Sequence, residues 1–272
     1  MRIQILGTAA AEGWPGIFCG CNTCARARIA GGKNLRSRAS VQIDDIFKID
    51  LPPDTYYHSI RFGLKLSELK YLFYTHSHGD HFAPDEIEYL RPTFAHNLKN
   101  APVRIYGSAK VINIIKARCE RRSLPVELHI AEPYVPIKAD YLTFTPIIAS
   151  HSATELCLNY IVQSESATVL YASDTGLYSD ETMEHLKKYK FDLLIVECTL
   201  GTSLLMPSKS HMTLPGVMKL RNRLIRLGTA TKETPVVITH FSHNIGLLHD
   251  ELEKIANRRG IEVAYDGIVL EV

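Results

Sequence analysis

The sequence lacks the features that mark several protein classes. Its 272 residues contain no uninterrupted apolar segment long enough to span a bilayer, no internal repeat and no linker rich in Pro, Gly or Ser. The net charge of +2 is too small to indicate a nucleic acid or an anionic membrane as a partner. The first six residues have the pattern of a strand rather than of a signal peptide. We therefore expect one domain, residues 1–272, located in the cytoplasm.

Cysteine is also scarce, and the six cysteines present are not spaced for disulfide bonds. Cys19, Cys21 and Cys24 lie too close together to link distant segments. Gly and Asn between them are typical of a loop, so metal ligation explains this cluster better than burial in a core. The other three cysteines are isolated and fit core positions: Cys119, Cys157 and Cys198.

The strongest chemical signal is the segment Thr75-His76-Ser77-His78-Gly79-Asp80-His81. It follows the apolar run 69–74, which has the composition of a buried strand. Gly79 permits a tight turn, so three imidazoles and one carboxylate can converge on one point in space. The composition predicts a metal site at the end of this strand.

Polar side chains follow further predicted strands in the same way. A lone His or Asp at a strand end is most often a turn or capping residue. Here the pattern recurs beside a histidine cluster, which favours a shared site. The residues concerned are His151 after strand 144–149, Asp174 after 169–172, Glu197 after 193–196 and His240 after 235–238.

The order of the predicted elements indicates the fold class. Strands at 141–148, 157–163 and 168–172 read as a mostly antiparallel meander, and from residue 181 to residue 264 helices and strands alternate. With 46% hydrophobic residues, the chain can bury a large core. This order predicts an α/β fold with two stacked sheets and helices on the outer faces.

These residues resemble the metallo-β-lactamase superfamily, whose signature is His-x-His-x-Asp-His. Its fold is a four-layer αβ/βα sandwich with the metals at one edge. The later His, Asp and His occur in the family's order, so the resemblance covers nearly the whole chain. The ligand set that it implies is His76, His78 and His151 for one metal, and Asp80, His81 and His240 for the second, with Asp174 bridging them.

Neutral imidazoles and carboxylates suit zinc, and a mixed nitrogen and oxygen donor set also admits manganese or iron. Two such ions about 3.5–4 Å apart can share a hydroxide that forms near neutral pH, and we expect this hydroxide to be the nucleophile. The resemblance further implies that Asp80 orients the hydroxide. It also implies that Asp50 supports the ligand loop by hydrogen bonds without touching metal.

The cysteine cluster narrows the resemblance to one branch. A structural zinc site needs four ligands, and the cysteines of loop 19–24 supply three. His243 is the candidate for the fourth, since it lies three residues after His240 and one turn can send the two imidazoles to different sites. The cluster, followed by Ala25-Arg26, is similar to the phosphoribosyl cyclic phosphodiesterase branch, the carbon-phosphorus lyase accessory protein of phosphonate breakdown. In that branch the three cysteines and the later His bind a structural zinc.

Glu197 is followed, after a loop, by Ser210-His211-Met212-Thr213. This resembles the Glu and His-Ser-Thr pair of cyclic phosphodiesterases and ribonuclease Z type enzymes, where the His lies near the scissile phosphate. An imidazolium at His211, oriented by Glu197, can stabilise the phosphorane charge or protonate the departing oxygen. Alone, His211 would be read as a cap of the following helix. Beside Glu197 and a dinuclear site, we expect it to be catalytic.

The sequence departs from the family around the expected substrate cleft. The first loop, residues 7–13, is rich in Ala, and Leu158-Asn159-Tyr160 stands where a Gly-Tyr pair is usual. We expect both segments to border the cleft. Four aromatic or imidazole residues are expected there as well: Trp14, Tyr56, Tyr57 and His58.

We predict a dinuclear metal-dependent phosphodiesterase acting on a small cyclic phosphate diester, with one additional structural zinc. Three alternatives stay open: a ribonuclease Z type RNA-processing hydrolase, an ester or lactone hydrolase, and a non-catalytic metabolite-binding member resembling pyrroloquinoline quinone biosynthesis protein B. The first normally requires a long basic insertion, which the sequence does not contain. The family often forms homodimers, and no feature of the sequence selects an oligomeric state.

Overall fold

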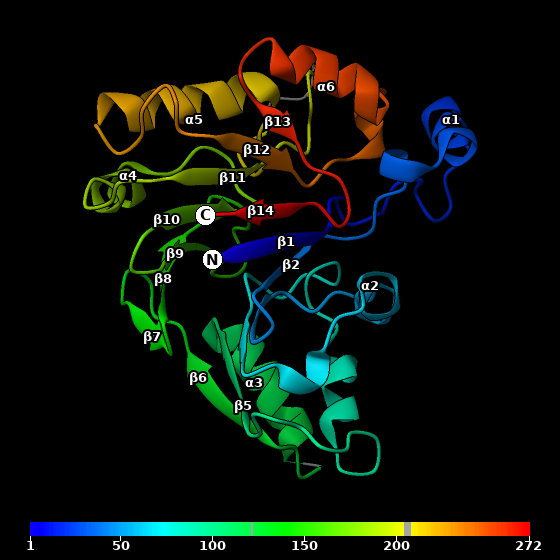
Figure 1. Ribbon diagram of the computed structural model, residues 1–272, viewed down its shortest axis with the longest axis vertical. Helices are drawn as coiled ribbons and strands as arrows, with labels where there is room; N and C mark the ends of the chain where they lie inside the picture. The colour runs from blue at the N-terminus through cyan, green and yellow to red at the C-terminus, as the bar shows by residue number, and fades with distance from the viewer. Residues whose placement is uncertain (121, 204–207) are drawn as a thin grey trace.

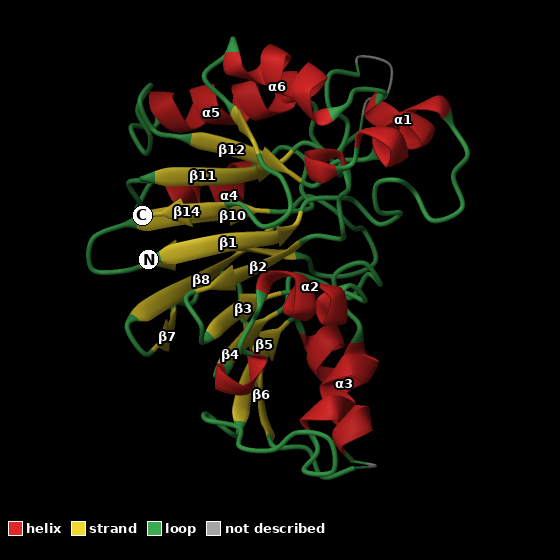
Figure 2. Cartoon of the chain, turned by 45° about the vertical axis from the view of Figure 1, so that its right-hand side comes forward, coloured by secondary structure: helices red, strands yellow, loops and turns green. Residues whose placement is uncertain are grey.

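The computed structural model describes residues 1–120, 122–203 and 208–272. Two seven-stranded sheets pack against each other, and helices cover their outer faces, which gives four layers (Figures 1 and 2). The predicted α/β sandwich is therefore confirmed. Within the described residues, no helix is long and apolar enough to cross a membrane.

The first sheet joins the two ends of the chain, since its edge strand comes from the C-terminus and pairs with the first strand. Asp44, at a φ of 45°, turns the chain between the second and third strands, which form the antiparallel hairpin expected from the sequence. In spatial order the strands are β14 (Val269–Glu271), β1 (Arg2–Gly7), β2 (Ser40–Ile43), β3 (Phe47–Ile49), β4 (Tyr71–Phe73), β5 (Val103–Gly107) and β6 (Val126–Ile130).

The second sheet combines a parallel half with an antiparallel half. Its parallel strands are runs of Val, Ile and Leu, because both of their faces are covered. In spatial order the strands are β13 (Glu262–Val263), β12 (Val236–Thr239), β11 (Leu193–Glu197), β10 (Thr168–Ala172), β9 (Leu158–Gln163), β8 (Leu142–Ile148) and β7 (Ile137–Ala139).

Most of the helices lie on the outer faces of the two sheets, whereas the first lies beyond the edge of the sandwich (Figure 1). The α-helices are α1 (Asn22–Ala30), α2 (Thr55–Phe62), α3 (Ala109–Cys119), α4 (Asp180–Leu186), α5 (Leu214–Arg226) and α6 (His249–Asn257). Short 3-10 helices are η1 (Gly32–Asn34), η2 (Leu66–Glu68), η3 (Pro84–Leu90) and η4 (His243–Ile245). Helix α5 buries Leu214, Val217, Leu220 and Leu224, the spacing of one helical face. Its N-cap is Thr213, whose hydroxyl accepts a hydrogen bond from the Gly216 amide.

Aromatic side chains fill the space between the sheets. The rings of Phe73 on β4 and Phe144 on β8 stack with centroids 3.9 Å apart, and Phe47 and Tyr160 pack around them. Separate apolar clusters lie between the second sheet and helices α4 to α6, and between the first sheet and α3. These three cores hold the strand ends in place.

Strands β4, β8, β10, β11 and β12 all end at the edge of the sandwich where the predicted ligands lie. Three residues that follow strands there adopt a left-handed backbone conformation: Asp50, Asp174 and His240, with φ values of 62°, 49° and 58°. Residues other than glycine adopt this conformation at an energetic cost, and residues held in it are concentrated at functional sites. Backbone strain at this edge is consistent with a site that places particular side chains.

Candidate dinuclear metal site

The histidine-rich loop after β4 is held by one buried carboxylate. Asp50 accepts hydrogen bonds from the backbone amide and the hydroxyl of Thr75, each at 2.8 Å. Its Oδ2 atom also lies 2.7 Å from Nδ1 of His81. Asp50 therefore fixes both ends of the loop without pointing into the cavity, as the resemblance implied.

Seven of the predicted ligands form two clusters that share Asp174. The first cluster is His76, His78, His151 and Asp174, and the second is Asp80, His81, Asp174 and His240. Within each cluster the candidate ligand atoms all lie within 4.8 Å of one another. Oδ2 of Asp174 lies 3.4 Å from Nε2 of His76, in the first cluster, and 3.0 Å from Nε2 of His81, in the second. The carboxylate between the clusters matches the expected bridging position.

Two features of the imidazole nitrogens fit divalent metals between the ligands. Nε2 of His81 and Nε2 of His240 lie 3.3 Å apart, and the buried Nε2 of His76 has no hydrogen-bond partner among the described residues. Burial, and next the nearby His81, hold the pKa of His76 well below its usual value. A neutral imidazole with an unused inward nitrogen is the form that binds a metal.

Each of the five histidines also has a partner for its outward nitrogen. Such partners fix the tautomer and orientation of a ligating imidazole. The pairs are Nδ1 of His76 with Oγ1 of Thr75 at 3.0 Å, Nε2 of His78 with Oε1 of Glu155 at 3.6 Å, Nδ1 of His81 with Oδ2 of Asp50 at 2.7 Å, Nδ1 of His151 with the carbonyl of Ser210 at 3.3 Å, and Nδ1 of His240 with Oγ1 of Thr199 at 2.8 Å.

Sequence reasoning missed Glu155 and Thr199. Glu155 accepts hydrogen bonds from the amide and hydroxyl of Ser77, both at 3.0 Å, and from Lys110 at 3.1 Å. It lies four residues after His151, so an acidic residue this close to a predicted ligand was a usable signal. Thr199 gave no such signal, because its hydroxyl meets a histidine 41 residues further along the chain.

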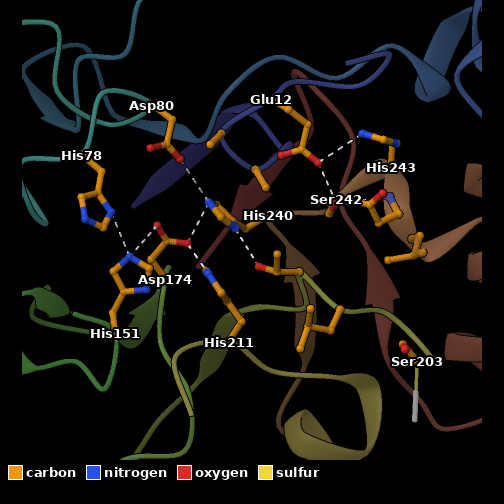
Figure 3. A pocket seen from close by; sticks show the side chains of 16 residues that line it. Glu12, His78, Asp80, His151, Asp174, Ser203, His211, His240, Ser242 and His243 are labelled. Carbon is orange, nitrogen blue, oxygen red and sulfur yellow. Dashed lines mark hydrogen bonds and ion pairs between the residues drawn. The ribbon is translucent and has the colours of Figure 1, made fainter. Parts of the chain in front are cut away.

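The predicted Glu197 and His211 pair is present. Glu197 is fully buried at the end of β11, and its Oε1 atom lies 2.8 Å from Nδ1 of His211. The backbone amides of Thr175 and Thr199 also donate to this carboxylate. Burial disfavours the imidazolium, but the hydrogen bond and charge of Glu197 outweigh this effect, so the pKa of His211 is raised. His211 lines the same cavity as Asp174 (Figure 3).

The cysteine loop and His243 also come together. Nδ1 of His243 lies 3.6 Å from the sulfur of Cys21 and 3.9 Å from that of Cys19, and Cys24 completes the cluster. The six cysteines are free thiols. Hydrogen bonds to the Cys21 sulfur, first from the Cys24 amide and next from Cys19, lower its pKa to about 6. A thiolate at this position suits metal ligation. The Cys21 sulfur also caps α1, which begins at Asn22.

Five of the seven candidate ligands line a cavity of about 460 Å³, namely His78, Asp80, His151, Asp174 and His240, while His76 and His81 are buried behind it. Part of the Ala-rich first loop borders it as expected, through Ala10, Ala11 and Glu12. The remaining cleft residues expected from the sequence do not line this cavity: Trp14, Tyr56, Tyr57, His58, Leu158, Asn159 and Tyr160.

The physical reasons for these errors differ. Trp14 is only 2% exposed and lies under the guanidinium of Arg36. His58 is buried on the inner side of α2, where its Nε2 atom lies 2.7 Å from the Ser37 hydroxyl. Tyr160 lies in a central strand, and its hydroxyl donates to the carbonyl of Tyr74. Each of these side chains supports the fold from behind the site.

A sandwich of this kind, with two His and Asp clusters joined by one carboxylate at its edge, defines the class of metal-dependent hydrolases with the metallo-β-lactamase fold. Residues 54–241 match the model of the beta-lactamase superfamily domain, so the chain belongs to that family. No curated protein matches the sequence.

Solved structures with the same fold match along the full chain. A crystal structure described as a new diphosphatase from the PhnP family has 26% sequence identity and a TM-score of 0.76, covering 100% of this chain and 97% of the other. Zn²⁺-bound PqqB from Methylobacterium extorquens has 14% identity and a TM-score of 0.74, with 100% of both chains covered. The short form of human tRNase Z has 19% identity and a TM-score of 0.67, covering 100% and 99%.

Proposed function

We propose that this metal-dependent hydrolase is a phosphodiesterase that cleaves a small cyclic phosphate diester. The observation that carries the proposal is the hydrogen-bonded pair of Glu197 and His211 at the wall of the cavity that contains both ligand clusters. A charged imidazole next to two candidate metal positions suits a reaction in which negative charge develops on phosphate oxygens and on a departing alkoxide.

Two divalent cations would occupy the clusters, with zinc or manganese favoured by the donor set and iron also admitted. Once bound, they would lower the pKa of water and withdraw charge from the phosphoryl oxygens. His76, His78 and His151 would hold one cation, while Asp80, His81 and His240 would hold the other, with Asp174 between them.

The chain's own residues would direct the remaining steps. Burial opposes ionisation of Asp80, but the charge of the nearby His81 outweighs this effect, so the pKa of Asp80 is lowered. Its carboxylate would orient the attacking water. As the oxygen of water bonds to phosphorus and one water proton passes to solvent, one ester P–O bond breaks, and the alkoxide takes a proton from Nε2 of His211, which solvent then restores. Glu197 would accept the hydrogen bond from Nδ1 of His211, so that the Nε2 side of the imidazolium faces the leaving group.

A third metal, a structural zinc, would bind Cys19, Cys21, Cys24 and His243. This cluster lies directly beside the catalytic one, because His240 and His243 belong to the same short segment after β12. A role in phosphonate breakdown and a cytoplasmic location, both expected from the sequence, belong to the same proposal. A homodimer, frequent in the family, is part of the same proposal.

Processing of RNA fits the site less well, despite the structural likeness to tRNase Z. Within the described part of the chain, no lysine or arginine lines the cavity with the two clusters. Proteins that bind polynucleotides rely on such groups to neutralise phosphates. The cavity volume of about 460 Å³ suits a small molecule.

The test is turnover by metal-loaded protein of a panel of cyclic and linear phosphodiesters, with the monoester product identified by mass spectrometry. Metal analysis of the same sample should give three ions per chain. Three ions without turnover of any diester would overturn the proposed function. A single ion, retained only by the cysteines, would favour a binding protein similar to PqqB instead.

A further inference from the structure

Glu12 is a charged residue in the cavity wall that the proposed mechanism does not use. It lies in the loop after β1, and Figure 3 shows it beside Ser242 and His243, on the segment that follows β12. The Ser242 hydroxyl donates to Oε1 of Glu12 at 2.6 Å, and Nε2 of His243 lies 3.7 Å from the same oxygen. The second oxygen, Oε2, accepts no hydrogen bond from any described residue.

The backbone holds Glu12 in this position before any substrate binds. The Ala10 amide donates to the Phe241 carbonyl at 3.0 Å, and the Gly13 amide donates to the Ala10 carbonyl at 2.9 Å. The loop is thus attached to the segment that carries His240 and Ser242. A carboxylate fixed in this way loses little conformational freedom when it binds a ligand.

The charges around Glu12 limit what it can bind. Apart from the metal-site residues and the His211 pair, it is the one charged side chain among the described residues lining this cavity. Lysine and arginine side chains line neighbouring cavities instead: Arg36 and Arg38 border a second cavity that Glu12 also lines, and Lys209 borders a third beside Ser208, Ser210 and His211. An anionic group that contacted the Glu12 carboxylate directly would be repelled.

An ionised carboxylate only accepts hydrogen bonds, so its partner must be a donor. Ser242 and Asn244, which line the same cavity, add neutral polar groups to its wall. A carboxylate flanked by hydroxyl and amide groups is a common arrangement for binding a sugar hydroxyl, and an acidic residue binds ribose hydroxyls in dinucleotide sites for the same reason.

We infer that Glu12 is the specificity-determining residue of the cavity and binds a hydroxyl group of the substrate. The substrate is then a phosphodiester of a polyol, with a free hydroxyl on the side of Glu12 and Ser242. This inference rests on the proposed phosphodiesterase function.

The experiment compares pairs of substrates that differ by one hydroxyl. One pair is glycerol 1,2-cyclic phosphate and propane-1,2-diol cyclic phosphate, and the other is adenosine 3′,5′-cyclic phosphate and its 2′-deoxy analogue. The readout is the ratio of kcat/KM within each pair for the metal-loaded wild-type protein and for Glu12→Ala. A ratio is insensitive to the fraction of active protein, so partial loss of the neighbouring zinc does not affect it.

We expect the wild-type protein to favour the hydroxyl-bearing member of at least one pair by about 10- to 100-fold, the range of a hydrogen bond to a charged group. Glu12→Ala should bring that ratio close to one. Glu165→Ala is the matched control, since Glu165 is an exposed acid in the turn between β9 and β10. Its ratio should equal that of the wild-type protein.

Three results would overturn the inference. One is a wild-type ratio near one in both pairs, and another is a ratio that Glu12→Ala leaves unchanged while zinc content falls, which would assign Glu12 only to the support of His243. The third is a Glu12-dependent preference for a choline phosphodiester over the polyol esters, which would assign Glu12 to an ammonium group. In each of these cases diesters are hydrolysed, whereas failure of the proposed function leaves every diester intact.

Discussion

Nδ1 of His211 lies 2.8 Å from Oε1 of Glu197, although 13 residues separate the two in the sequence. Glu197 is fully buried, and the His211 side chain is 24% exposed at the wall of the cavity. A buried carboxylate with an imidazole as its partner stabilises the charged form of that imidazole. The pair therefore favours an imidazolium at the cavity wall, where we expect the leaving oxygen.

The first prediction concerns this imidazolium. His211→Ala should lower kcat about 10²- to 10⁴-fold, because general acid catalysis contributes that much, while metal content stays at the wild-type level. Activity needs the charged ring, so it is lost as the pH rises through the pKa of His211, which Glu197 raises. Glu197→Gln should therefore shift the alkaline limb of the kcat profile to lower pH. An unchanged limb would assign Glu197 a structural role only.

Much of this site could be predicted because its chemistry is local in the sequence. Histidines and acids that directly follow apolar runs identify the ligands, since strands that end at one edge bring such residues together. Glu197 and His211 were found through their resemblance to known phosphodiesterases. The groups that were missed act across the fold: Thr199 contacts His240, 41 residues away, and Glu155 contacts Ser77, 78 residues away.

The prediction of the cleft residues was wrong for a related reason. Aromatic side chains near a site suggest a substrate pocket, but the burial of a side chain depends on tertiary packing. Aromatic residues occur both in pockets and in cores, and Trp14 and Tyr160 are core residues. The fold class was easier to predict, because the meander and the later alternation of helix and strand permit few arrangements.

The second prediction concerns the cysteine cluster. Cys21→Ser should reduce zinc by one ion per chain and lower the melting temperature by about 5–10 °C, or roughly 2–3 kcal/mol for a domain of this size. His243→Ala should act in the same direction. The matched control is Cys119→Ser at the end of α3, outside the cluster, which should retain the wild-type zinc content. Zinc analysis and calorimetry measure both effects, and a normal zinc content in Cys21→Ser would refute the assignment.

The third prediction separates a ligand from its support. His78→Ala should abolish activity and remove one catalytic metal with the fold intact. Glu155→Gln should weaken metal binding about 10- to 100-fold, since its carboxylate faces Nε2 of His78 and accepts two hydrogen bonds from Ser77. Competition with a chelator measures the affinity. The exposed Glu165 provides the control, and equal affinities in Glu155→Gln and Glu165→Gln would contradict the role of Glu155.

The fourth prediction concerns pH and stability at His58. Burial, followed by the nearby Lys48 and Arg61, lowers the pKa of this histidine to about 2, whereas its value in the unfolded chain is about 6.5. The unfolded state therefore binds a proton first, and the stability that depends on neutral His58 is lost as the pH falls below 6.5. Between pH 6.5 and 4.5 this single group costs roughly 2–3 kcal/mol, at about 1.4 kcal/mol for each pH unit.

His58→Gln removes the titrating ring while retaining an amide that can bond to the Ser37 hydroxyl. Its free energy of unfolding should fall less steeply between pH 6.5 and 4.5 than that of the wild-type protein, as measured by urea titrations at each pH. His96→Gln is the control, because His96 is exposed. The candidate metal ligands are the same in both proteins, so the difference in slope between wild type and variant reports the contribution of His58 alone. Equal slopes for wild type and His58→Gln would contradict the prediction, since protonation of His58 would then not lower the free energy of unfolding.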